Sequence, residues 1–86
     1  MIFEFFNAHY DPCGPDERPT FFGFSCPKRP DHMCTGLVLS SNPGRVIIPD
    51  HTWGWNGDRE KPTFWPSIDC KACSHGWIEN GQWRDA

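Results

Sequence analysis

Two clusters of cysteine constrain this 86-residue chain more than any other feature of its sequence. Cys26 and Cys34 bracket a proline-rich stretch, and Cys70 and Cys73 have the two-residue spacing that lets both sulfur atoms reach one metal ion. A chain of this length buries a limited core and commonly depends on disulfides or a metal for its stability. We therefore expect these cysteines to stabilise the fold.

Zinc is the expected cofactor. The chain has five cysteines, an odd number that cannot pair completely within one molecule. Its N-terminal segment lacks the basic region and long apolar run of a secretory signal, and no apolar run is long enough to span a bilayer. In a cytoplasmic, reducing compartment, clustered cysteine and histidine bind metals more often than they form disulfides.

A structural zinc site has four ligands, and several side chains compete for these positions. We predict the ligands Cys26, Cys34, Cys73 and His75, with Cys70 as the first replacement. Two alternatives remain open, which are ordinary buried thiols and a redox pair formed by Cys70 and Cys73. His9, Cys13 and His51 are expected to have no role in metal binding.

The local sequence predicts a small β-rich domain, mainly an antiparallel meander with long irregular loops. Nine prolines and eight glycines interrupt long regular elements, and no segment has a helical period. We predict strands over residues 1–6, 21–25, 35–40, 45–49 and 52–55, and two more within residues 75–84. Turn sequences at 41–44 and at Asn80-Gly81 predict hairpins. Residues 1–86 are expected to form one domain.

Charge and motifs favour binding over catalysis. The net charge is −3 and no basic stripe is present, which disfavours nucleic acid as a partner. The chain shows no phosphate-binding loop and no His-Glu-x-x-His motif, and no serine, histidine and aspartate order that indicates a triad. An alternative function is a zinc-dependent hydrolase, for which Glu60 is the candidate acid or base, beside Asp58. We expect the protein not to be an enzyme.

Three segments together resemble a family of small phage and prophage proteins of unknown function. They are the Cys-Pro at 26–27 followed by Cys34, the central WGWNGDREKPTFWPSI, and the late CSHGWIENGQW. The resemblance covers residues 21–83 and implies a phage-type protein in the cytoplasm of a bacterial host, with a zinc-stabilised β fold. Because this chain widens the first cysteine pair and adds Cys70, the choice between Cys70 and Cys73 as the late ligand stays open.

The central segment is the predicted partner-binding surface. Aromatic residues make up 15% of the chain, more than a core this small is expected to hold. Trp55, Arg59 and Trp65 combine rings and charge in the way that interface hot spots do. We predict a protein-binding module with a host protein as its partner, acting as an inhibitor of a host or anti-phage defence factor. A nucleic-acid-binding zinc module is a further alternative for the function. The alternative to an exposed aromatic surface is that all the rings pack around the zinc.

Overall fold

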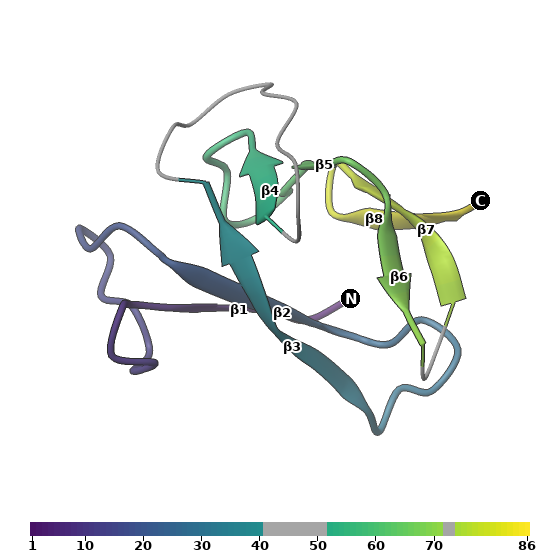
Figure 1. Cartoon of the computed structure of the whole chain (residues 1–86), viewed down its shortest axis with the longest axis horizontal. Coiled ribbons are helices and arrows are strands. Elements are labelled where there is room, and N and C mark those ends of the chain that lie inside the picture. Colours follow the sequence, from purple (N-terminus) through teal and green to yellow (C-terminus); the bar gives the residue numbers. More distant parts are fainter. Residues whose placement is uncertain (41–51, 72–73) are drawn as a thin grey trace.

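The computed structural model describes residues 1–40, 52–71 and 74–86, which form two β-sheets (Figure 1). The first sheet consists, in spatial order, of β1 (Phe3–Phe6), β2 (Phe21–Ser25), β3 (Met33–Leu39), β4 (Thr52–Trp55) and β5 (Phe64–Trp65). The second consists of β6 (Ile68–Cys70), β7 (Ser74–Glu79) and β8 (Gln82–Asp85). β3 and β4 are parallel, and the other neighbouring strands are antiparallel.

The β-rich, mainly antiparallel fold class is confirmed. The hairpin predicted at Asn80-Gly81 joins β7 to β8, and both turn residues have the positive φ of a type I′ turn, 50° and 75°. The turn predicted at 41–44 and the strand predicted at 45–49 lie outside the described residues. β5 and β6 were not predicted from the sequence. Across residues 1–40, 52–71 and 74–86, no helix has the length and apolarity that a membrane crossing requires.

The core is formed by buried side chains from strands of both sheets. Phe22 and Phe24 of β2 are fully buried, because alternate residues of a strand point to the same face. The Phe22 ring stacks on Phe64 of β5 with 3.9 Å between centroids, and Phe24 stacks on Trp83 of β8 at 5.6 Å. Burying a phenylalanine side chain contributes about 1.5–3 kcal/mol. β2 therefore packs both against β5, at the far edge of its own sheet, and against β8 of the second sheet.

The long connection between β1 and β2 is held in place by Arg59. Its guanidinium donates hydrogen bonds to the carbonyl oxygens of Gly14, at 2.9 Å, and Glu17. The same group lies 5.9 Å from the centroid of the Phe5 ring, within the range of a cation–π contact. The irregular loop at residues 7–20, which was predicted from its proline and glycine content, thus gains fixed contacts from a distant part of the chain.

Candidate functional site

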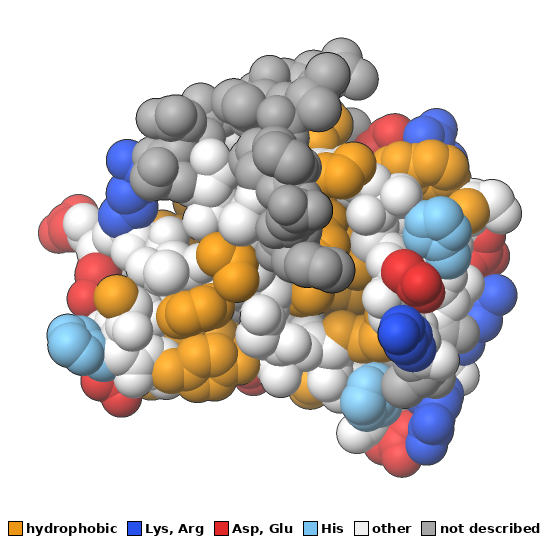
Figure 2. All heavy atoms as spheres, viewed as in Figure 1, with side chains coloured by type: hydrophobic (Ala, Val, Ile, Leu, Met, Phe, Trp, Pro, Cys, Tyr) orange, Lys and Arg blue, Asp and Glu red, His pale blue; other side chains and the backbone are white. Residues whose placement is uncertain are grey.

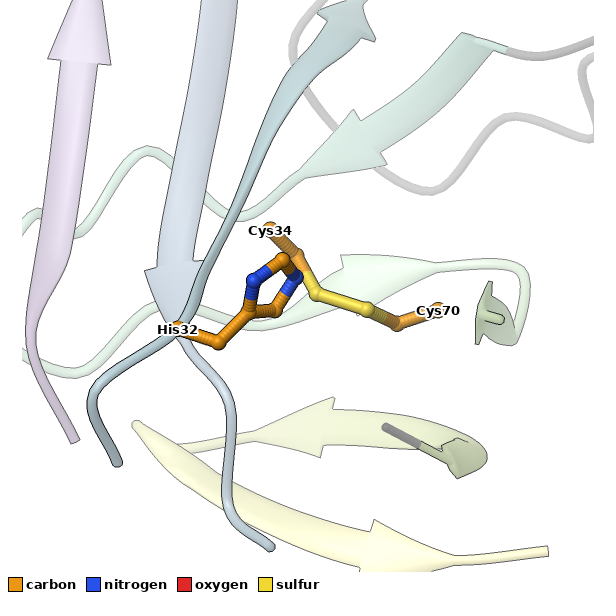
Figure 3. Close-up of side chains that lie close together, drawn as sticks. All are labelled: His32, Cys34 and Cys70. Atoms are coloured by element: carbon orange, nitrogen blue, oxygen red, sulfur yellow. A yellow bond between two sulfur atoms is a disulfide. The ribbon is translucent and has the colours of Figure 1, made fainter. Parts of the chain in front are cut away.

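A sulfur cluster joins the two sheets at β3 and β6. Cys34 and Cys70 form a disulfide with their Cα atoms 6.5 Å apart, and the His32 ring lies beside it (Figure 3). One ligand atom from each of these three side chains lies within 4.8 Å of the other two. Cys34 is buried and the other two are half-buried. Two sulfur atoms and an imidazole nitrogen are donors that zinc accepts, so this group can hold a metal when the cysteines are reduced.

The disulfide and the metal are competing states of this cluster. A metal needs deprotonated thiolates, and the sulfur atoms of a disulfide are not available as thiolates. The disulfide therefore argues against a bound metal in this conformation. The structure supplies a possible metal-binding group, and zinc itself remains a prediction.

The structure places the three predicted zinc ligands that lie within the described residues in different surroundings. Cys34 belongs to the cluster, and Cys70, predicted as the first replacement, is its sulfur partner. Cys26 is buried at the end of β2, with 2% of its surface exposed, and its amide donates to the carbonyl oxygen of His32 at 2.9 Å. His75 lies on β7 and contacts a serine instead of this cluster. Cys73 lies outside the described residues.

The predicted partner-binding residues contribute to packing in the described part of the chain. Trp55 is half-buried, donates through Nε1 to the carbonyl oxygen of Asp58 at 3.2 Å, and packs against Phe5 with 5.0 Å between centroids. Arg59 holds the loop at residues 7–20 through its two carbonyl contacts. Trp65 is half-buried on β5. Trp55 and Arg59 therefore have structural roles. The partner-binding role of all three residues stays a prediction.

The charged turn after β4 is organised by its own backbone. The Asp58 carboxylate accepts hydrogen bonds from the amides of Glu60, at 2.9 Å, and Lys61, at 3.0 Å. These backbone hydrogen bonds, from Lys61 first and Glu60 second, lower the pKa of Asp58, because they stabilise its charged form. Glu60, the candidate for zinc-dependent hydrolysis, has an exposed side chain in this turn. Asp58 therefore shapes the turn.

Ser67 and His75 form the contact of greatest chemical interest. Ser67 lies in the link between β5 and β6, and His75 is the second residue of β7. The Ser67 Oγ and His75 Nε2 atoms are 2.9 Å apart, although the two residues are eight positions apart in the chain. A hydroxyl in hydrogen-bond contact with an imidazole is the arrangement that activates a serine as a nucleophile.

Strand alternation explains why the two side chains meet. β6 pairs antiparallel with β7 so that Asp69 lies opposite His75 and Ile68 lies opposite Gly76. Residues directly opposite each other in such a pair project to the same face. Ile68 is buried in the core, so its neighbours Ser67 and Asp69 project to the outer face, as His75 does.

A hydrogen bond to Ser67 and close packing at Gly76 fix the backbone next to this pair. The Trp53 indole donates through Nε1 to the carbonyl oxygen of Ser67 at 3.2 Å, which ties the serine to β4. Gly76, the residue after His75, is buried and pairs with Asp85 of the neighbouring strand β8. A Cβ atom at this position would lie 2.7 Å from the Trp83 ring and in contact with the carbonyl oxygen of Arg84. Only glycine therefore fits at this position without displacing β8.

The outer face continues from the histidine toward β8. The His75 and Trp77 rings are 6.3 Å apart between centroids, and the Arg84 guanidinium lies 5.2 Å from the Trp77 ring centroid. Arg84 also forms an ion pair of 2.8 Å with Glu79. Figure 2 shows charged and histidine side chains gathered over the region where β6–β8 lie. The outer face is thus a polar, open surface with one half-buried tryptophan.

The fold and this contact define a small two-sheet β protein that carries a serine–histidine pair on the open face of its second sheet. Residues 13–86 match the model of the family described as bacterial ubiquitination-like system serine protease (BubE). The chain belongs to this family. Neither the curated proteins nor the solved structures include one that matches significantly. The matched range contains residues 21–83, on which the resemblance was based, and the phage origin stays a prediction.

Reasoning from the sequence missed the pairing of Ser67 with His75. Ser67 was not among the predicted site residues, and His75 was assigned to zinc. Both residues stand inside the segments that carried the resemblance, the central TFWPSI and the late CSHGW. The signal available in the sequence for this pairing was a serine and a histidine in two separate motifs of one family.

Proposed function

We propose that this protein is a serine hydrolase in which Ser67 is the nucleophile and His75 is the general base. The observation that carries the proposal is the 2.9 Å contact between Ser67 Oγ and His75 Nε2. A serine hydroxyl is a weak nucleophile until a neighbouring base takes its proton, and this requires a separation of about 2.6–3.2 Å. The family description names a serine protease, which supports the same reaction class.

The reaction follows from this geometry in two stages. Ser67 Oγ attacks a carbonyl carbon of the substrate while His75 Nε2 takes the hydroxyl proton. When the tetrahedral intermediate collapses, the bond to the leaving group breaks and the histidine returns the proton to that group. Water then attacks the acyl-serine ester with His75 again as the base, which releases the acid and restores the serine.

The surroundings of the pair favour a segment of a protein as the substrate. The pair lies on an open sheet face that continues over Trp77 to Arg84. A hollow of about 660 Å³ lies at the β7–β8 turn and is lined by Arg84, Glu79 and Lys61 among others. It could receive part of an extended substrate chain. A macromolecule lying on this face would itself exclude water from the pair, which strengthens electrostatic interactions there.

Labelling with a fluorophosphonate probe tests the proposal, because such probes react with activated serines. We expect intact-mass spectrometry and peptide mapping to show one adduct, located on Ser67. Ser67→Ala should abolish labelling, and His75→Gln should slow it strongly. Ser74→Ala is the matched control, because this serine lies on the opposite face and donates to Asp85 at 3.1 Å. An unlabelled wild-type protein, or equal labelling of Ser67→Ala, would contradict the proposal.

Zinc bound by the reduced sulfur cluster is a second proposal. His32, Cys34 and Cys70 have the donor types of a structural zinc site, lie close enough together to share one ion, and would supply three of its four ligands. The ion would hold β3 against β6, the same two strands that the disulfide joins. The predicted set of Cys26, Cys34, Cys73 and His75 shares Cys34 with this group.

Metal and thiol content distinguish the two states of the cluster. Elemental analysis of protein purified under reducing conditions should give one zinc per chain, and a thiol assay after chelation should detect the released cysteines. His32→Ala should lower the zinc content, whereas His75→Gln should not. Stoichiometric zinc in His32→Ala and its loss in His75→Gln would instead support the ligand set predicted from the sequence.

Binding without catalysis is the remaining candidate. The family description places its members in a bacterial ubiquitination-like system, in which contact with other proteins is expected. A host protein partner and an inhibitory role remain predictions, with Trp55, Arg59 and Trp65 as the predicted contacts. If Ser67→Ala retains the full biological effect of the wild type, this candidate replaces the hydrolase.

A further inference from the structure

We propose that Asp69 is the positioning residue for His75, so that the site works as a Ser67–His75–Asp69 triad; this rests on the proposed function. Asp69 is the residue of β6 directly opposite His75, and the two side chains project to the same outer face. Ser67 precedes Asp69 by two positions and shares that face. The side chains of Ser67, His75 and Asp69 therefore lie on one face of the second sheet, near its β6 edge.

The histidine has one ring nitrogen left for an orienting partner. Its Nε2 atom contacts Ser67 Oγ, and within the described residues its Nδ1 atom has no hydrogen-bond partner. A general base must keep Nε2 unprotonated to accept the serine proton, which requires the proton of the neutral ring to be on Nδ1. A carboxylate that accepts a hydrogen bond from Nδ1 stabilises this tautomer and the imidazolium that forms during reaction.

Asp69 is the carboxylate best placed for this role. Opposite residues of an antiparallel pair have Cβ atoms about 4.5–5.5 Å apart, a distance that an aspartate and a histidine ring can close by side-chain rotation. Among the described residues, the Asp69 carboxylate has no hydrogen bond or ion pair that would hold it elsewhere. Catalytic hydrogen bonds are commonly loose before the substrate binds and tighten in the complex.

The other acidic groups of the second sheet are already engaged. Glu79 shares the outer face but lies farther along β7, roughly 13 Å from His75 at the usual strand rise, and is paired with Arg84. Asp85 is opposite Gly76, on the face away from His75. Its Oδ1 atom accepts hydrogen bonds from Trp83 and Ser74. Within the described sheet, Asp69 is therefore the carboxylate that is both near and unengaged.

Histidine-ring NMR tests this assignment independently of activity. In protein labelled with ¹⁵N-histidine, at a pH where the ring is neutral, we expect His75 to carry its proton on Nδ1. Asp69→Asn should shift the ring toward the tautomer protonated on Nε2, whereas Glu79→Gln, which removes a carboxylate from the same face, should not. The His75 signals are assigned by their loss in His75→Gln.

Probe labelling supplies the second readout. Asp69→Asn should slow fluorophosphonate labelling of Ser67 by at least about tenfold, and by up to about 10⁴-fold if the triad behaves as in other serine hydrolases. Asp69→Glu should restore part of the rate. Glu4→Gln, which removes an exposed carboxylate from β1 in the other sheet, should stay within about twofold of wild type. An unchanged tautomer together with an unchanged labelling rate in Asp69→Asn would overturn the assignment while leaving the Ser67–His75 proposal intact. If wild-type Ser67 is not labelled at all, the proposed function fails, and the tautomer measurement still decides the role of Asp69.

Discussion

The two faces of the β6–β8 sheet carry different chemistry on neighbouring residues. On the inner face, Ile68 is buried in the core and Cys70 is covalently joined to Cys34 of the other sheet. On the outer face, Ser67 and His75 are in hydrogen-bond contact beside open solvent. One short strand and the residue before it therefore serve both stability and the proposed reaction.

This division separates substitutions that affect activity from those that affect folding. An outer side chain such as His75 is exposed, so its replacement removes little packing. An inner side chain such as Cys70 links two sheets, so its replacement weakens the support of β6. If the two faces are as independent as the alternation indicates, substitutions on one face should leave the other unchanged.

The largest effect is expected at His75. His75→Gln should lower the rate of Ser67 labelling by about 10²–10⁴-fold, because the serine loses its general base. The free energy of unfolding in urea should change little, since the His75 side chain is exposed. A folded His75→Gln protein that is labelled as fast as wild type would show that the hydrogen bond has no catalytic role.

A large effect on stability is expected at Cys70. In oxidised protein, Cys70→Ser should lower the free energy of unfolding by about 3–4 kcal/mol, because the disulfide joins residues 36 positions apart. Cys13→Ser is the control, since Cys13 is the free cysteine of the described residues. Urea denaturation with and without reductant measures both. Equal stability of Cys70→Ser and wild type under both conditions would exclude the covalent and the metal-bound link alike.

Gly76 connects the two faces. Gly76→Ala should destabilise the protein by about 1–3 kcal/mol, because the added methyl group would overlap the carbonyl oxygen of Arg84 and approach the Trp83 ring. The displaced β7 should also slow Ser67 labelling, since His75 is the preceding residue. Gly14→Ala is the matched control, because a Cβ there would meet nothing within 4 Å. Normal labelling in a destabilised Gly76→Ala protein would mean that the outer pair tolerates movement of its sheet.

The smallest effect is expected at Asp85 and depends on pH. Hydrogen bonds from Trp83 first and Ser74 second lower the pKa of Asp85 below its ordinary value of 3.8. A carboxyl group with a lowered pKa in the folded state contributes stability above its unfolded-state pKa, and this contribution is lost as the pH falls through the folded-state value. Asp85→Asn should therefore be slightly less stable than wild type near neutral pH, and the difference should shrink below about pH 4. Urea denaturation at neutral and acidic pH measures the difference in free energy of unfolding between wild type and Asp85→Asn. If this difference grows on acidification, the hydrogen bonds do not favour the charged carboxylate.

Much of the fold was accessible from local sequence. Asn80-Gly81 predicted the β7–β8 hairpin, because these residues adopt the positive φ angles that its turn requires. The phenylalanine-rich segment at 21–25 predicted β2, and the proline and glycine content predicted the absence of regular structure at 7–20. β5 and β6 escaped prediction because each has only two or three residues, too few to show a period.

The sequence by itself determined that the chain is a small β protein with long loops, and its cysteine spacing predicted a stabilising site that includes Cys34, with Cys70 as a replacement ligand. These properties follow from turn chemistry, residue spacing and composition, which act over a few neighbouring residues. Tertiary structure alone decided that Arg59 holds a loop, that Cys34 meets Cys70, and that His75 faces Ser67. Each of these contacts depends on which strands pair and in which register, because a shift of one residue would turn His75 toward the core and Gly76 toward the serine.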